Sequence, residues 1–214
     1  GDERLKELEQ KLSEANANCK EVAGRLTATR RKAATTVERG MKDRLVPLGI
    51  PKVRFSISIE PREFQRDGCD AVAFLFSANS SSDMMPISQV ASGGEIARVM
   101  LSLKAMISNA VKLPTIIFDE IDTGVSGKIA EKMALIMQEM AQSERQVISI
   151  THLPQIAARG TTHYKVYKEE TENGTESTMT RLNDEQRVNE IAQMLSGSDI
   201  TDAAKHNAKD LLGA

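Results

Sequence analysis

Two acidic residues that directly follow a short apolar run are the first candidates for chemistry. Asp119 and Glu120 come after residues 115–118, whose sequence TIIF predicts a strand buried on both faces, as in a parallel sheet. Ligands of open α/β sheets bind at the C-terminal ends of strands, and neighbouring strand residues point to opposite faces, so the two acids are expected to have separate roles. We expect Asp119 to hold a hydrated Mg²⁺ that bridges nucleotide phosphates, and Glu120 to orient or deprotonate the attacking water. The alternative interpretation is a pair of solvated loop acids.

The tetrapeptide SGGE at residues 92–95 is a second candidate. Ser92 and Glu95 have the spacing of a capping box, so a simple helix start is one interpretation. A cap does not explain Gly93 and Gly94, because each glycine in a helical turn costs up to ~1 kcal/mol relative to alanine. That loss favours a phosphate that approaches the free N–H groups and the positive end of the helix dipole.

A histidine is the third candidate. His152 follows a second apolar strand, predicted at residues 147–150, and this position would bring it near Asp119 and Glu120. We interpret it as a functional partner of these acids, and an ordinary turn residue is the alternative.

A Gly-Lys pair close to these candidates does not form a phosphate-binding loop. Such a loop needs Gly, four residues, Gly-Lys and then Ser or Thr. Asp122 stands five positions before Gly127, and Ile129 follows Lys128, so both ends of the motif fail. No other Gly-Lys pair occurs in the sequence.

The N-terminal region has the pattern of a coiled coil. Residues at alternating spacings of three and four form a narrow seam between charged positions, namely Leu5, Leu8, Leu12, Ala15, Cys19, Val22, Leu26 and Thr29. An amphipathic helix on a globular core is the alternative, although such a helix usually has a wider apolar face. Pro47 and Gly49 are expected to end the helix.

The rest of the chain alternates strands and helices. Alternating apolar residues on either side of QRDG predict a hairpin, and the Asn-Gly pair in ENGT predicts another. Between them we expect a helix at 93–111, the strand at 115–118, a helix at 125–140, the strand at 147–150 and a short helix after Pro154. Two helices are expected to end the chain. The strand–helix–strand core indicates a doubly wound α/β layer.

Composition limits the class of protein. The 214 residues carry a net charge of −2 and a pI near 6.0, so any contact with nucleic acid would have to come from a local patch. Cys19 and Cys69 fit neither a metal-binding spacing nor a disulfide framework, and a reducing cytoplasm is expected. No apolar run is long enough to span a bilayer, and no signal peptide is recognised. Gly1 in place of methionine suggests a tag remnant on a piece of a longer protein.

Taken in order, the three candidates resemble the signature, Walker B with D-loop, and switch-histidine elements of ABC-type ATPases. SGGE stands for the signature, TIIFDE for Walker B, IDTGVSG with Asp122 for the D-loop, and His152 for the switch histidine. The heptad arm is similar to that of the SMC-like branch. The longer strings VASGGEIARVMLSLK, IIFDEIDTGVSGK and THLPQIAARG resemble the RecN family of bacterial DNA repair proteins, from Val90 to about Lys168.

The resemblance implies an α/β fold, the C-terminal lobe of an ABC/SMC-type P-loop ATPase head with an N-terminal coiled-coil helix. Residues 1–46 would be one strand of the coiled-coil arm, and residues 47–214 the C-terminal half of the head. The Walker A lysine of this family lies in an N-terminal lobe, so TIIFDE would belong to a nucleotide site whose phosphate loop is elsewhere.

The resemblance also implies ATP and Mg²⁺ as ligands and a homodimer that holds ATP between two heads. Residues 92–95 and Asp122 would contact nucleotide, the signature residues Ser92, Gly93 and Gly94 doing so on the opposite head. Asp119, Glu120 and His152 would act in their own head. Further partners would be the N-terminal lobe of the same protein and DNA, with no membrane, in a nucleoid-associated cytoplasmic protein.

The function that the resemblance implies is ATP hydrolysis in the recombinational repair of DNA double-strand breaks. A chromosome-organising SMC-like scaffold ATPase is the alternative, and a head that binds partners without catalysis is a third possibility. The basic run at residues 25–32 is interpreted as a solvated face of the coil, with contact to DNA phosphates as its alternative.

Overall fold

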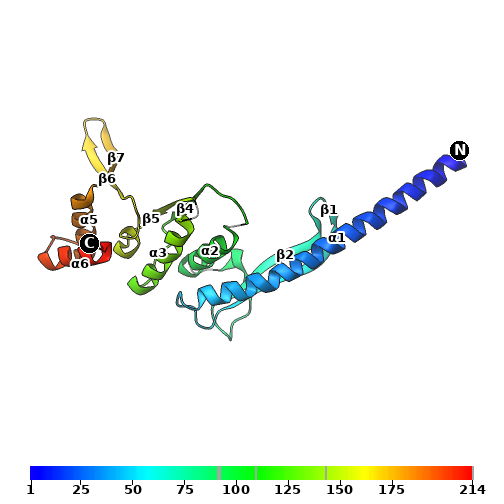
Figure 1. Ribbon diagram of the computed structural model, residues 1–214, viewed down its shortest axis with the longest axis horizontal. Helices are drawn as coiled ribbons and strands as arrows, with labels where there is room; N and C mark the ends of the chain where they lie inside the picture. The colour runs from blue at the N-terminus through cyan, green and yellow to red at the C-terminus, as the bar shows by residue number, and fades with distance from the viewer. Residues whose placement is uncertain (91–92, 109, 143, 214) are drawn as a thin grey trace. The chain divides into compact units, whose positions relative to one another are not determined.

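The computed structural model describes residues 1–90, 93–108, 110–142 and 144–213 (Figure 1). Contacts group the chain into two compact units. The first comprises Gly1–Val46 and Ile50–Ala91, and the second comprises Pro47–Gly49 and Ser92–Ala214. Each unit is described by itself.

The first unit is built on a single long helix, α1 (Asp2–Leu45), which has 44 residues. Asp2 and Glu3 lie in its first turn and Lys42 and Arg44 in its last, where each charge is favourable to the helix dipole. The helix ends at Leu45, two residues before Pro47, because a proline cannot continue the ladder of hydrogen bonds.

One face of α1 is exposed to solvent and another is buried. The predicted seam is open to solvent over the first half of the helix: Leu5, Leu8, Leu12 and Val22 are exposed, with Leu12 62% accessible. The buried face lies in the second half and consists of Ala23, Ala34, Met41 and Leu45, flanked by half-buried Thr27, Arg30 and Val37. From Ala23 to Met41 these positions are one residue later than the continued seam, which is a rotation of about 100° around the helix.

A β-hairpin covers this second face. Strand β1 (Arg54–Gln65) pairs antiparallel with β2 (Gly68–Ser77), and β2 pairs with the short β3 (Met85–Pro86), which leads into a 3₁₀ turn at Ile87–Gln89. Both long strands contact α1, as Figure 1 shows. The buried side chains of this unit include Met41, Leu45, Ile50, Val53, Phe55 and Phe76.

Polar contacts fix the tip of the hairpin to the helix. Thr27 Oγ1 donates to both carboxylate oxygens of Asp70 at 2.8 and 2.9 Å, and Arg30 Nη1 donates to Asp70 Oδ2 at 3.0 Å. Burial raises the pKa of Asp70, but the hydrogen bonds and the charges of Arg30 and Arg31 outweigh it, so the pKa lies below its ordinary value. Gly68 has φ +104°, a conformation that residues with a side chain rarely adopt, so a glycine is favoured at this position.

The second unit contains the parallel strand pair. Its elements in order are α2 (Gly93–Ile107), β4 (Thr115–Asp119), α3 (Gly127–Ala141), β5 (Gln146–Ile150) and α4 (Pro154–Ala157). β4 and β5 run parallel in the register Thr115↔Gln146 to Asp119↔Ile150, joined through α3. Ile116 and Phe118 form the core with the inner face of α3, which presents Ala130, Met133, Ala134, Met137 and Met140.

The other face of β4 and β5 is exposed. Ile117, Ile148 and Ile150 are 59%, 39% and 48% accessible, and no described element of the chain covers them. The prediction that residues 115–118 are buried on both faces is therefore wrong for this chain. An apolar strand predicts two covered faces, but the described residues of α2, α3, α4 and Leu48 that form the core pack with Ile116 and Phe118, on one face of the strand.

The unit ends in a second hairpin and two helices. Strands β6 (Tyr164–Thr171) and β7 (Gly174–Arg181) pair antiparallel around the predicted Asn-Gly turn, where Gly174 has φ +107°. Helix α5 (Asp184–Ser196) begins with a capping box between Asn183 and Gln186, and α6 (Asp202–Leu212) is capped by Thr201, whose side chain accepts from Ala204 N. These two helices share a small core of Ala158, Ile191, Ala192, Ala204 and Ala208.

Candidate functional site

The carboxyl ends of the two parallel strands bring the predicted site residues to one edge of the sheet. Asp119 is the last residue of β4 and is paired with Ile150, the last residue of β5. The ladder continues one step further, because the Glu120 N–H donates to the Ile150 carbonyl at 2.9 Å. Asp119 is on the same side of the sheet as Ile117, Ile148 and Ile150, so its exposed carboxylate belongs to the uncovered face.

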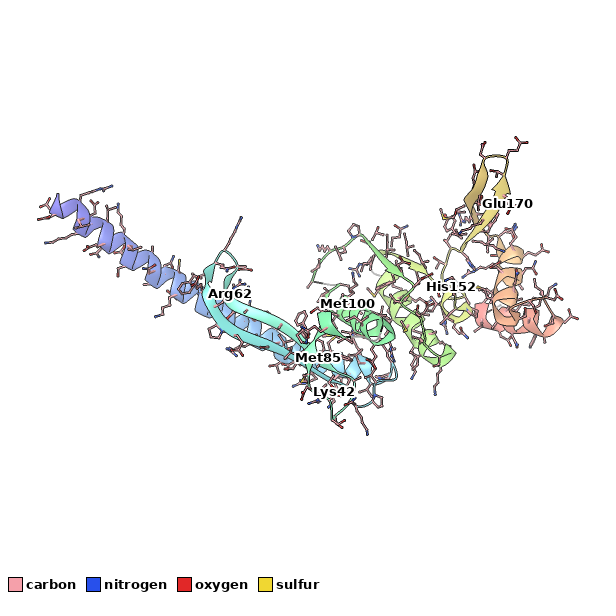
Figure 2. The ribbon with its side chains drawn as sticks, turned by 180° about the vertical axis from the view of Figure 1, so that it is seen from behind. Lys42, Arg62, Met85, Met100, His152 and Glu170 are labelled. Carbon is pink, nitrogen blue, oxygen red and sulfur yellow. The ribbon has the colours of Figure 1, made fainter. Side chains whose placement is uncertain are left out.

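Glu120 and His152 are in direct contact. His152 Nε2 lies 2.7 Å from Glu120 Oε1, and the side chains are 83% and 50% exposed respectively. His152, labelled in Figure 2, lies in the turn that follows β5. The two predicted catalytic residues are thus adjacent, and both side chains are exposed to solvent.

The backbone of Glu120 has an uncommon conformation. Its φ is +52°, in the left-handed region that non-glycine residues rarely occupy. The Glu120 carbonyl accepts a hydrogen bond from Thr123 Oγ1 at 3.1 Å, which helps to hold the turn. A residue kept in this region costs on the order of 1 kcal/mol or more, and such residues are concentrated at functional sites.

The loop from β4 to α3 is tied to the turn after β5 through Asp122. This residue, predicted to contact nucleotide, is 4% exposed, and its Oδ2 accepts a hydrogen bond from Thr151 Oγ1. Its backbone carbonyl accepts from Val125 N at 3.1 Å, one residue before Ser126, which caps α3. The structure therefore places the Asp122 carboxylate inside the loop, separate from the exposed pair of Glu120 and His152.

The signature residues lie at the start of α2. Ser92 lies outside the described residues, and Gly93 and Gly94 form the first turn together with half-buried Glu95. An added Cβ on Gly93 would meet nothing within 4 Å, whereas one on Gly94 would lie 3.1 Å from the Thr123 carbonyl oxygen. Among the described residues, packing thus accounts for a glycine at position 94 and gives no reason for one at position 93.

Arg98 connects the first turn of α2 to the segment Pro47–Gly49 by hydrogen bonds. Arg98 Nε donates to the Gly94 carbonyl at 3.0 Å, and its Nη1 donates to the Leu48 carbonyl at 2.6 Å. These contacts hold the helix start next to the segment Pro47–Gly49. Neither Arg98 nor Thr151 was identified as a site residue from the sequence. Arg98 contacts a carbonyl 50 positions away and Thr151 contacts the carboxylate of a distant loop residue, and such contacts leave no local sequence pattern.

The described residues contain no cluster of three or more His, Cys, Asp or Glu side chains able to hold a metal ion by themselves. Mg²⁺ in nucleotide sites is commonly bound by one or two carboxylates together with waters and substrate phosphates. The exposed Asp119 fits that kind of partial site.

Comparison with curated proteins gives consistent relatives over nearly the whole chain, although no family model matches. The chain is 36% identical over 216 residues to the DNA repair protein RecN of Halalkalibacterium halodurans, and this alignment covers 99% of the chain and 38% of that protein. It is 39% identical over 192 residues to RecN of Rickettsia conorii, covering 90% of the chain and 35% of that protein. The chain therefore spans a little over a third of the length of these relatives.

Solved structures with the same fold are SMC head domains. An Smc head domain with a coiled coil and joint from Pyrococcus yayanosii matches 77% of the chain with a TM-score of 0.58 and 20% identity, over 30% of its own chain. A structure from work on ATP-driven dimerization and DNA-stimulated activation of SMC ATPases matches 80% of the chain with a TM-score of 0.53 and 19% identity. That match covers 98% of the other chain. At these identities the likeness establishes the fold, and it confirms the predicted α/β head lobe with a long N-terminal helix.

Proposed function

The chain belongs to the RecN family of DNA repair proteins, and from this premise we propose that it is the C-terminal lobe of an ATP-hydrolysing SMC-like head that acts in recombinational repair of DNA double-strand breaks. The observation that carries the proposal is the contact between Glu120 and His152 at the carboxyl end of a parallel strand pair. This is the edge of an open α/β sheet at which ligands bind.

Glu120 is the residue we assign to the attacking water. Its carboxylate is half exposed and has a free approach from solvent, so it can accept a proton or a hydrogen bond from water. The Nε2 atom of His152, 2.7 Å away, orients that carboxylate. The left-handed backbone conformation of Glu120 turns the chain away from the direction of β4. This change of direction supports a role for Glu120 that differs from that of Asp119.

Asp119 is the residue we assign to Mg²⁺. Its carboxylate is on the uncovered face of the sheet, beside three exposed isoleucines. Mg²⁺ neutralises phosphate charge when it is bound, and the remaining ligands would come from water, from the nucleotide and from an N-terminal lobe. The same uncovered face is where we expect that lobe to pack, because its burial would remove exposed apolar surface from water.

Gly93 supports an anion-binding role for the start of α2. The dipole of a helix favours an anion at its first turn, and an added Cβ on Gly93 would meet no described residue within 4 Å. We propose that this turn, with Ser92 and Glu95, meets the γ-phosphate held by a second head, so that two heads close around ATP. Asp122 belongs to the same proposed interface through its loop.

The remaining partners follow from the family. The relatives are DNA repair proteins, so DNA is proposed as the substrate of the complete protein, which we place in the cytoplasm with the nucleoid. No described helix is both long and apolar enough to span a membrane.

The proposal is tested by Glu120→Gln in a protein of the full length of the relatives. The wild type should hydrolyse ATP, and the variant should bind ATP while its turnover falls at least about a hundredfold, because the amide cannot accept the proton. Glu144→Gln is the matched control, since Glu144 is another exposed glutamate with positive φ, +56°, in the same unit. Turnover of Glu120→Gln within a few-fold of that control would contradict the assignment.

A further inference from the structure

Thr151, the residue before His152, contacts both loops of the proposed site. Its Oγ1 donates to Asp122 Oδ2 and accepts from the Leu153 N–H at 3.0 Å. A threonine hydroxyl has one proton to donate and two lone pairs to accept, so both bonds form at the same time. One side chain therefore joins the loop after β4 to the turn after β5.

The Asp122 end of this connection is rigid. Asp122 is buried, and its carbonyl accepts from Val125 N immediately before the capped start of α3. A hydrogen bond to a buried polar group is costly to lose, because the group left without its partner cannot bond to water instead. The Thr151 hydroxyl is therefore tied to a fixed point of the core.

The His152 side chain has no comparable support of its own. It is 83% exposed, and an exposed pair such as its contact with Glu120 contributes little to stability, so the position of the histidine depends on its backbone. The backbone on either side of it is fixed. The Thr151 hydroxyl closes a three-residue turn on the Leu153 N–H, and Leu153 is the N-cap of α4, which packs through Ile156 into the core.

We propose that Thr151 is a positioning residue for ATP hydrolysis: through its bond to Asp122 it holds the turn that places His152 Nε2 against Glu120. The inference rests on the proposed function, which assigns water activation to Glu120. It also gives the Asp122 carboxylate a defined role, which is to accept the hydrogen bond from the Thr151 hydroxyl and so connect the loop between β4 and α3 to the histidine turn.

The kinetic test uses a full-length protein with Thr151→Val, which keeps the shape and removes the hydroxyl, and Thr151→Ser, which keeps the hydroxyl. Thr151→Val should lower kcat about tenfold to a hundredfold, with KM for ATP within about twofold, because a displacement of about 1 Å has effects of that size. Thr151→Ser should retain kcat within about twofold. Equal kcat for the valine variant and the wild type would overturn the proposal, and so would equal losses in the valine and serine variants.

A double-mutant cycle asks whether the two residues act as one unit. If Thr151 works through Asp122, then Asp122→Ala combined with Thr151→Val should lower kcat no further than the more damaging single change. Multiplicative losses would show independent roles and contradict the coupling.

A measurement on residues 1–214 tests the geometry without activity. The Leu153 amide should exchange its hydrogen at least about tenfold faster in Thr151→Val than in wild type, and at nearly the wild-type rate in Thr151→Ser. The Gly197 amide, which is bonded to the Gln193 carbonyl at the end of α5, is the internal reference for an amide away from this turn. Unchanged exchange at Leu153 in the valine variant would overturn the proposal.

The results separate this inference from the function on which it rests. A full-length wild type that does not hydrolyse ATP overturns both. An active wild type with an equally active Thr151→Val variant overturns the positioning role alone and leaves the proposed ATPase intact.

Discussion

Nε2 of His152 lies 2.7 Å from Oε1 of Glu120, although 32 positions separate the two residues in the chain. The parallel register of β4 and β5 produces this contact, because it aligns Asp119 with Ile150 and adds the bond from Glu120 N to the Ile150 carbonyl. Both side chains then leave the sheet at the same edge. The backbone pairing thus brings the two residues to the same edge, and within that frame the Thr151 bonds hold the turn that carries His152.

The two glycines that start α2 should respond differently to alanine. Gly94→Ala should make residues 1–214 less stable than Gly93→Ala by about 1 kcal/mol, because only the Cβ at Gly94 would be forced against a backbone oxygen, that of Thr123. Chemical denaturation of the two variants measures this difference.

In a full-length protein, Gly93→Ala should weaken ATP-dependent association of heads although it does not lower stability. A methyl group there would occupy the space in which we expect the phosphate of the facing head. Sedimentation with a non-hydrolysable ATP analogue provides the measurement. Association equal to that of the wild type would favour the simpler interpretation of Gly93 as part of a helix start.

Removal of the Asp70 charge should loosen the hairpin on α1 in a pH-dependent way. Because the pKa of Asp70 is lowered on folding, the ionised form contributes stability above the ordinary value of 3.8, and this contribution is lost as the pH falls through the lower folded value. Asp70→Asn should therefore lower Tm by a few degrees at neutral pH, and the difference from wild type should shrink below about pH 4.

Asp67→Asn is the matched control for that experiment. Asp67 is also paired with an arginine, Arg62 near the hairpin tip (Figure 2), but its side chain is 66% exposed. Exposed pairs contribute little, so its Tm should stay close to wild type. A Tm difference for Asp70→Asn that is the same at pH 3 and pH 7 would mean that its charge has no part in the contact.

Much of the architecture follows from local sequence patterns. The long helix ending before Pro47, both hairpins, the strand–helix–strand core and the two final helices were all predicted, because spacing and turn residues are local signals. The hairpin of β6 and β7 is an example, since the Asn-Gly pair marks its turn and Gly174, paired with Thr171 where the turn ends, has a positive φ.

Features that depend on contacts distant in sequence were not predictable in the same way. The covered face of α1 includes Thr27 and Arg30, and a search for apolar spacing selects the neighbouring seam instead. Likewise, an apolar strand gives no sign that one face of β4 stays open, and no local pattern marks the positive φ of Glu120 or the bond from Thr151 to Asp122. The proximity of His152 to Glu120 was predicted because it follows from strand direction alone.

The last prediction concerns residues 1–214 in isolation. They include Asp119, Glu120 and His152 but lack a loop of the form Gly, four residues, Gly-Lys and Ser or Thr, so they lack the lysine and the backbone cradle that supply most contacts to a triphosphate. The two carboxylates would repel the triphosphate unless Mg²⁺ and that cradle offset their charge. The exposed isoleucines of β4 and β5 should also promote self-association.

For residues 1–214 alone we therefore expect no measurable ATPase activity and at best weak binding of Mg·ATP by calorimetry. Both activity and binding should be restored when a separately expressed N-terminal lobe is added with its half of the coiled coil. Tight binding of Mg·ATP to residues 1–214 alone would contradict a nucleotide site divided between two lobes.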